Sequence, residues 1–152
     1  MTVAGLLVFC AEMARLGAVI SAPDDWMPKC GGVEEGGYHV TAGVNGYVLT
    51  YREKDMIDVV SESPVQDVVM EQVFVQVTTN MAAERLAEAS AETGLAMPEY
   101  SVAEMEQMAI DRHMRWSAVQ EDLLSRLNPE WRAHQAVRNA ERLEKIKAFF
   151  AP

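Results

Sequence analysis

The sequence predicts an α+β fold in which a small antiparallel β-meander packs against an N-terminal helix and three C-terminal helices. Three observations support this class: one stretch rich in strand-forming residues, an Asn-Gly pair typical of a hairpin, and three helix-start signals farther along the chain. We expect a single domain over residues 1–152, with a helix and the sheet in residues 1–63 and the helical part in residues 64–152.

The first helix is expected over residues 2–16, where apolar side chains recur at the i, i+3, i+4, i+7 spacing. Gly17 follows at a position where helices commonly end, and Ala18–Ser21 is a candidate short strand. Residues 22–37 contain two prolines and four glycines, which predicts an irregular, exposed loop.

The clearest strand signals are Tyr38–Ala42 and Tyr47–Tyr51, which are rich in β-branched and aromatic residues. Asn45 and Gly46 lie between them and form the strongest short hairpin signal. A third run, Met56–Val60, follows a polar turn. The three runs predict an antiparallel meander with one face covered by helices.

A helix start follows the predicted sheet directly. Ser63 is placed to cap it, Pro64 occupies the first helical position, and Gln66 completes a capping box. The helix is expected over residues 64–92 and is apolar on nearly every face, as is typical of a central core helix. The valines and threonines of residues 72–79 leave a strand as the alternative for that segment.

Two more capped helices complete the predicted fold. Ser101 opens a helix expected over residues 102–127, and Asn128 opens the last one, over residues 129–149. The last helix is basic, and positive charge late in a helix complements the helix dipole.

The formal net charge is −10, and it is unevenly distributed. Residues 1–128 hold 20 acidic and 8 basic residues, whereas residues 129–152 hold 3 and 5. An acidic surface repels phosphate, so nucleic-acid binding is excluded as the main task. It suits a basic protein partner instead, although many cytosolic proteins are acidic for solubility alone.

The run Val3–Cys10 is apolar enough to resemble the core of a signal peptide, but we expect it to be a buried helix. No basic residue precedes it, Glu12 follows closely, and the run is far shorter than the roughly 20 residues that a span needs. Cys10 and Cys30 have no CxxC spacing and no nearby histidine pair. We therefore expect two free thiols in a cytoplasmic protein that binds neither a membrane nor a metal ion.

No catalytic or cofactor motif is present in the sequence. Neither His113 nor His134 belongs to an HExxH or ExxH pair, and His39 alternates within a predicted strand. Nucleophile-elbow, dinucleotide-binding and phosphate-binding loop signatures are also missing. We therefore expect no enzyme, no catalytic residue, no cofactor and no metal ligand.

The loop after the first helix supplies the candidates for partner binding. It contains two acid pairs, Asp24 with Asp25 and Glu34 with Glu35, and one aromatic residue, Trp26. Tryptophan is over-represented at the centres of protein interfaces, and exposed acids attract a basic partner. Ordinary solvated charge is the alternative interpretation.

The order of elements resembles the immunity factors, or antitoxins, that neutralise NAD-hydrolysing necrotising toxins such as the tuberculosis necrotising toxin. The resemblance covers roughly residues 5–100 and comes from four segments: Cys10–Gly17, Gly37–Val40, Tyr47–Thr50 and Pro64–Leu86. It implies an antitoxin that binds a secreted NAD+ glycohydrolase domain one-to-one and occludes its active site, with no cofactor of its own. The alternatives are an acidic cytosolic chaperone or adaptor for a secreted effector and, at lower rank, a small hydrolase using scattered carboxylates.

Overall fold

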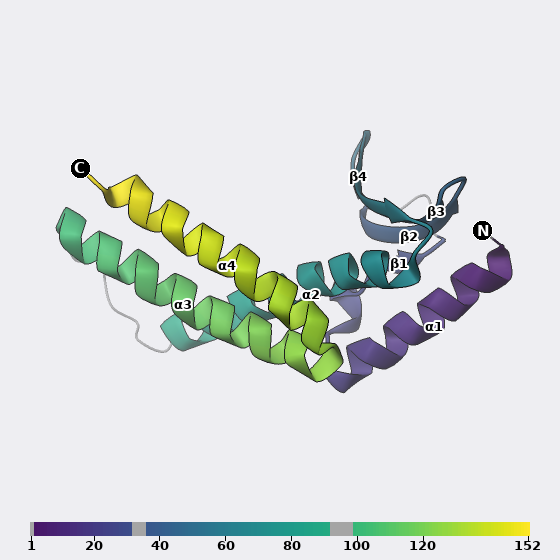
Figure 1. The fold of residues 1–152 in the computed structure, drawn as a ribbon, viewed down its shortest axis with the longest axis horizontal. Helices are drawn as coiled ribbons and strands as arrows, with labels where there is room; N and C mark the ends of the chain where they lie inside the picture. The colour runs from purple at the N-terminus through teal and green to yellow at the C-terminus, as the bar shows by residue number, and fades with distance from the viewer. Residues whose placement is uncertain (1, 32–35, 92–98) are drawn as a thin grey trace. The chain divides into compact units, whose positions relative to one another are not determined.

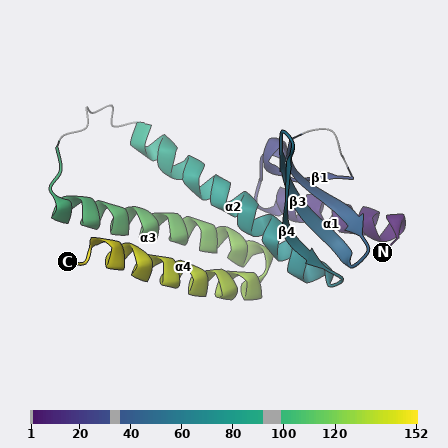
Figure 2. The same cartoon turned by 90° about the horizontal axis from the view of Figure 1, so that it is seen from above.

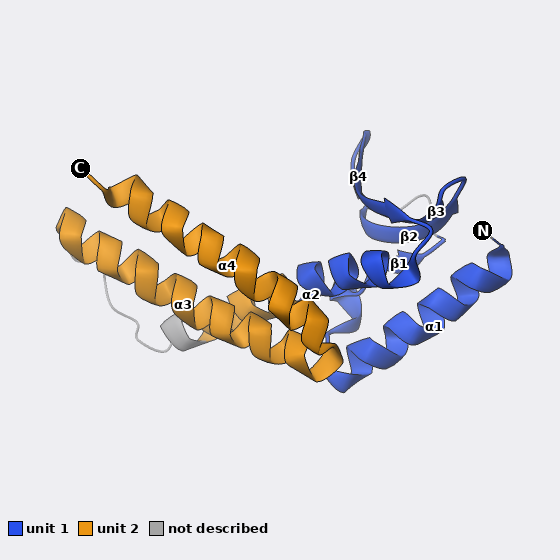
Figure 3. Cartoon of the chain, viewed as in Figure 1, with its two compact units in different colours: residues 1–77 blue, residues 78–152 orange. Residues whose placement is uncertain are grey.

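The computed structural model describes residues 2–31, 36–91 and 99–152, and it confirms the α+β class (Figure 1). Two compact units divide the chain, residues 1–77 and 78–152, so that the boundary falls inside a helix (Figure 3). The elements are, in chain order, α1 (Val3–Val19), the 3-10 helix η1 (Asp24–Trp26), β1 (Lys29–Cys30), β2 (Gly37–Gly43), β3 (Gly46–Glu53), β4 (Met56–Ser63), α2 (Gln66–Ala91), α3 (Val102–Leu127) and α4 (Pro129–Phe150).

The sheet has four strands in the order β1-β2-β3-β4. β2, β3 and β4 form the predicted antiparallel meander, and β1 adds a parallel strand that we did not expect within the loop. Gly46 closes the predicted hairpin with a φ of +121°, and a Cβ there would collide with the Ser63 carbonyl oxygen. Only glycine fits this position, because it has no Cβ and tolerates positive φ.

The strand predicted at Ala18–Ser21 is wrong. α1 continues through Gly17 to Val19. Gly17 is buried, and a Cβ built on it would lie 2.8 Å from the terminal methyl carbon of Met27. The glycine therefore permits close packing of the following loop on the helix instead of ending the helix, a role that local sequence does not reveal.

α2 is helical throughout residues 72–79, so the strand alternative for that segment is also wrong. The helix begins at Gln66, two residues later than predicted, within the usual uncertainty of helix ends. The Ser63 hydroxyl accepts a hydrogen bond from the Val65 backbone N–H at 3.1 Å, just before the helix. The predicted end at residue 92 lies outside the described residues.

The core of the first unit lies on one face of the sheet, beneath α1 and the first half of α2 (Figure 2). Phe9 of α1 stacks on Tyr47 of β3 with ring centroids 4.9 Å apart. The Tyr38 hydroxyl donates to the Gln76 side-chain oxygen of α2 at 3.1 Å. The fully buried apolar side chains of this unit include Val40, Leu49, Val69, Val73 and Phe74.

In the second unit, α3 and α4 form an antiparallel pair joined at Asn128, whose side chain accepts from the Glu130 N–H at 2.9 Å. The predicted cap at Ser101 is confirmed by a 3.2 Å bond from the Glu104 N–H. The buried side chains between the two helices are largely polar: His113, Ser117, Gln120, Gln135 and Asn139.

Asn139 is the centre of this polar cluster. Its amide nitrogen donates to Gln120 at 3.3 Å and to Glu121 at 3.2 Å, and its oxygen accepts from Gln135 at 3.0 Å. Gln120 in turn donates to the Thr79 hydroxyl of α2 at 3.0 Å. A buried polar network is favourable when its members are paired, so it specifies how these helices align.

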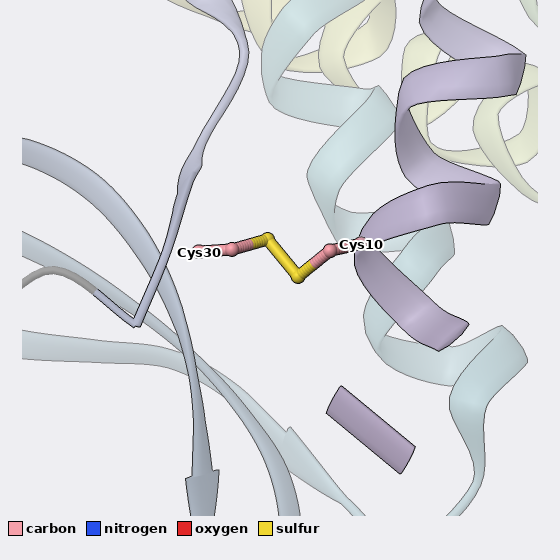
Figure 4. The surroundings of a disulfide bond; sticks show 2 residues. All are labelled: Cys10 and Cys30. Carbon is pink, nitrogen blue, oxygen red and sulfur yellow. A yellow bond between two sulfur atoms is a disulfide. The ribbon is translucent and has the colours of Figure 1, made fainter. Parts of the chain in front are cut away.

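A disulfide joins Cys10 of α1 to Cys30 of β1, with their Cα atoms 6.3 Å apart (Figure 4). The expectation of two free thiols is therefore wrong. The two residues are 20 positions apart in sequence, and no local motif pairs them. Pairing arises because β1 runs beside β2 and brings Cys30 next to the helix that covers the sheet.

We expect Asn139→Ala to lower the free energy of unfolding by about 1–3 kcal/mol, because it removes one hydrogen-bond partner from each of the buried amides of Gln120 and Gln135. Denaturant unfolding followed by circular dichroism measures the change. The matched control is Asn80→Ala, at an exposed position of α2, which should shift stability by less than about 0.5 kcal/mol. Equal effects of the two substitutions would contradict a stabilising role for the network.

Burial raises the pKa of the Tyr38 phenol, and the neighbouring Tyr51 adds to the rise. The fold therefore favours the neutral phenol: its contribution to stability is complete below the ordinary tyrosine pKa, about 10, and is lost as pH rises through the higher folded value. The urea midpoint should fall at alkaline pH, and Tyr38→Phe should reduce that fall. Tyr100→Phe, at an exposed position, should leave the alkaline profile of the parent unchanged.

Candidate protein interface

The predicted partner-binding residues Asp24, Asp25 and Trp26 lie together on η1. Both carboxylates are exposed, and the indole is half-buried. Two backbone hydrogen bonds close the turn, from Trp26 to the Pro23 carbonyl at 3.0 Å and from Met27 to the Asp24 carbonyl at 3.2 Å. The other two candidates, Glu34 and Glu35, lie outside the described residues.

The segment that carries η1 is attached to the first unit at both ends. On one side, the Ala22 N–H donates to the Gly17 carbonyl of α1 at 2.9 Å. On the other, the Met27 side chain packs on Gly17 and Cys30 is bonded to Cys10 (Figure 4). A turn that is held in this way presents its carboxylates with little ordering cost on binding.

Most of the net negative charge belongs to the unit that carries η1. Residues 1–77 contain 11 acidic and 4 basic residues, whereas residues 78–152 contain 12 and 9. One of the few cations, Arg15, bonds both oxygens of Glu12, through Nε at 2.8 Å and a terminal nitrogen at 2.5 Å. These bonds lower the pKa of Glu12 and raise that of Arg15, so this pair is charged over the physiological range.

A second exposed surface is β4, the last strand of the sheet. Its apolar residues Met56, Ile57 and Val59 are 65%, 57% and 60% exposed. We expected one face of every strand to be covered, which holds for β2 and β3 but not here. Local sequence gives no signal for this difference, because the position of a strand in the sheet is a property of the topology.

The groove between α3 and α4 has a volume of about 660 Å³ and is lined in part by His113, Ser117 and Asn139. His113 Nε2 lies 2.9 Å from the Asn139 carbonyl oxygen and 3.2 Å from the Ser117 hydroxyl. A carbonyl oxygen only accepts hydrogen bonds, so Nε2 carries a proton. This nitrogen therefore does not accept the hydroxyl proton of Ser117. The pair lacks the general base that would activate a serine as a nucleophile.

A metal site requires a cluster of ligand side chains, and a membrane span requires a long apolar helix. Within residues 2–31, 36–91 and 99–152, no group of three or more His, Cys, Asp or Glu side chains is placed to hold a metal ion. None of the helices in this part of the chain is both long enough and apolar enough to span a bilayer.

Comparisons with models of protein families, with curated proteins and with solved structures found no match. The resemblance to toxin-neutralising immunity factors therefore stays a prediction. The surface favoured by the geometry is the acidic turn η1, because its charge is exposed and its backbone is held in place.

We expect the pair Cys10→Ala and Cys30→Ala to lower the free energy of unfolding by about 2–4 kcal/mol, since the cross-link restricts the unfolded chain. Amide exchange at Trp26 and Met27 should accelerate, because the turn loses one of its attachments. Hydrogen-exchange mass spectrometry measures both effects. A reductant should destabilise the parent protein and leave the double variant unchanged; a parent insensitive to the reductant would contradict the proposed role of the bond.

Proposed function

We propose that this protein is an immunity protein that binds a cognate NAD+ glycohydrolase toxin domain one-to-one and occludes its active site. The observation that best supports a binding role is the acidic turn Asp24–Trp26, exposed and attached to a disulfide-linked helix and strand. The toxin as target follows from the resemblance over residues 5–100.

The charge of the first unit indicates the chemistry of the partner. An acidic surface speeds encounter with a basic one and selects against acidic competitors. Trp26 supplies the large, half-buried aromatic surface that often carries binding energy at the centre of an interface. The partner surface is therefore basic, with an apolar depression that takes the exposed part of the indole.

The disulfide bears on where this binding occurs. The sequence led us to expect a cytoplasmic protein, and cytosolic reductants keep most thiols reduced. The bond between Cys10 and Cys30 favours an oxidising compartment instead, such as the cell exterior or the periplasm. We therefore propose that the protein meets its toxin where disulfides persist.

A second candidate function is a chaperone or adaptor that holds an extended segment of a secreted effector. The uncovered strand β4 favours it, because an exposed sheet edge pairs with extended chain. Limited proteolysis of the complex distinguishes the two functions. An inhibited toxin stays folded and resistant, whereas a segment held by a chaperone leaves the rest of its protein open to cleavage.

Titrating a purified NAD+ glycohydrolase toxin with this protein tests the proposal directly. We expect hydrolysis to be lost at a one-to-one ratio. The pair Asp24→Asn and Asp25→Asn should slow association by roughly tenfold at low salt and by less at high salt, because screening removes the long-range attraction.

The matched control is the pair Glu84→Gln and Glu88→Gln, which removes the same charge from exposed positions of α2. It should change the association rate by less than about twofold. Unchanged hydrolysis at saturating protein would rule out inhibition of that toxin. Equal slowing by the two pairs would show that net charge matters and the turn does not.

A further inference from the structure

β4 lies at one end of the strand order and, among the described strands, pairs with β3 alone. The free end of the β3–β4 hairpin stands at the top of Figure 1. All four residues from Met56 to Val59 are exposed, although they alternate between the two faces of the strand. Such an edge presents unpaired backbone N–H and C=O groups in a row.

The regular part of this edge is well defined. Thr50 of β3 is opposite Val59, whereas its neighbour Leu49 is opposite Ser61, so Val60 is an extra residue that forms a bulge. Bulges bend a strand and interrupt pairing. Met56–Val59 is the unbroken run before the bulge, and it offers an incoming strand a regularly paired edge.

The two faces of this run differ in chemistry. Ile57 and Val59 are opposite Arg52 and Thr50 and therefore share one face, which is apolar along the edge. Asp58 is opposite Tyr51 and lies on the other face. The whole strand Met56–Ser63 contains two acidic residues and no basic one. Cross-strand partners of like charge destabilise a sheet, and those of opposite charge stabilise it.

We propose that β4 is a docking edge for an extended segment of the partner protein in which apolar and basic residues alternate. Its apolar side chains pack on Ile57 and Val59, and its basic side chains pair with Asp58. A second copy of this chain is a poorer occupant, because its own β4 brings an acid, Asp58, and no basic residue to the charged face. Main-chain hydrogen bonds supply affinity, and the alternation supplies specificity.

This inference deepens the proposed function and rests on it in one respect, namely that the partner is a basic protein. It adds a second contact, which is separate in sequence from η1 and uses backbone pairing in addition to charge. η1 offers surface charge to a folded surface, whereas β4 requires backbone in the extended state. The two contacts are therefore tested with different probes.

The probe for the edge is a short synthetic peptide that alternates valine and lysine, with blocked ends. We expect it to bind the intact, oxidised protein and to slow amide exchange in Met56–Val59 by about tenfold or more, because new hydrogen bonds form there. A peptide with the same residues in two blocks, and one that alternates valine and glutamate, should not do so. Equal binding of the block peptide would overturn the proposal, since unspecific charge attraction would then be sufficient.

Two variants locate the contact. Asp58→Lys should lower the affinity of the protein for the alternating peptide roughly tenfold, because an attractive cross-strand pair becomes a repulsive one. Glu84→Lys makes the same change of charge at an exposed position of α2, and it should alter peptide affinity by less than about twofold. The pair Ile57→Thr and Val59→Thr keeps strand-forming residues but removes the apolar face, and it should also weaken binding. Unaltered affinity in both edge variants would overturn the proposal.

The outcomes for the edge and for the immunity role separate cleanly. If the toxin is inhibited while the alternating peptide leaves β4 exchange unchanged, the docking edge is wrong and the proposed function stands. If the peptide protects β4 while the toxin remains active, the edge stands and its partner is another basic protein.

Discussion

The first unit depends on the apolar core that α1 and α2 form on one face of its sheet. Phe9, Leu49 and Phe74 are fully buried because α1 and α2 cover the face to which Leu49 and Tyr47 belong. Burying side chains of this size stabilises the fold by roughly 1.5–3 kcal/mol each. Two helices cover the central strands but leave β4 exposed, so the same packing that holds the sheet together also leaves its edge available for binding.

The two units use different means to define their structure. The first has an apolar core and a covalent link, Cys10–Cys30, that joins a helix to the sheet. The second aligns α3 with α4 through buried amides and a histidine centred on Asn139. Apolar contacts are tolerant of sliding, whereas paired amides are not, which explains why a seam with few large apolar residues still defines one arrangement. The same pairing accounts for His113 and Ser117, whose hydrogen-bond directions serve packing and not nucleophile activation.

Binding in the first unit combines charge with restraint. Acidic residues alone are common on proteins, and they do not identify an interface. Asp24 and Asp25 differ from other exposed acids because the segment around them is attached through Gly17, Met27 and the disulfide. The turn therefore loses less conformational entropy when a partner binds. β4 complements this turn, since its backbone is already extended and needs only a strand beside it.

The sequence by itself determined the features that depend on near neighbours. The caps at Ser101 and Asn128, the hairpin at Gly46 and the extents of α3 and α4 all follow from hydrogen bonds within a few residues. Only the tertiary structure decided the features that join distant residues. Met27 packs on Gly17 within α1, where a Cβ would collide with it, Cys10 meets Cys30 because β1 joins the sheet, and β4 is exposed because it comes last in the strand order. Those outcomes depend on which surfaces meet in the folded chain, and local sequence patterns do not predict contacts between distant residues.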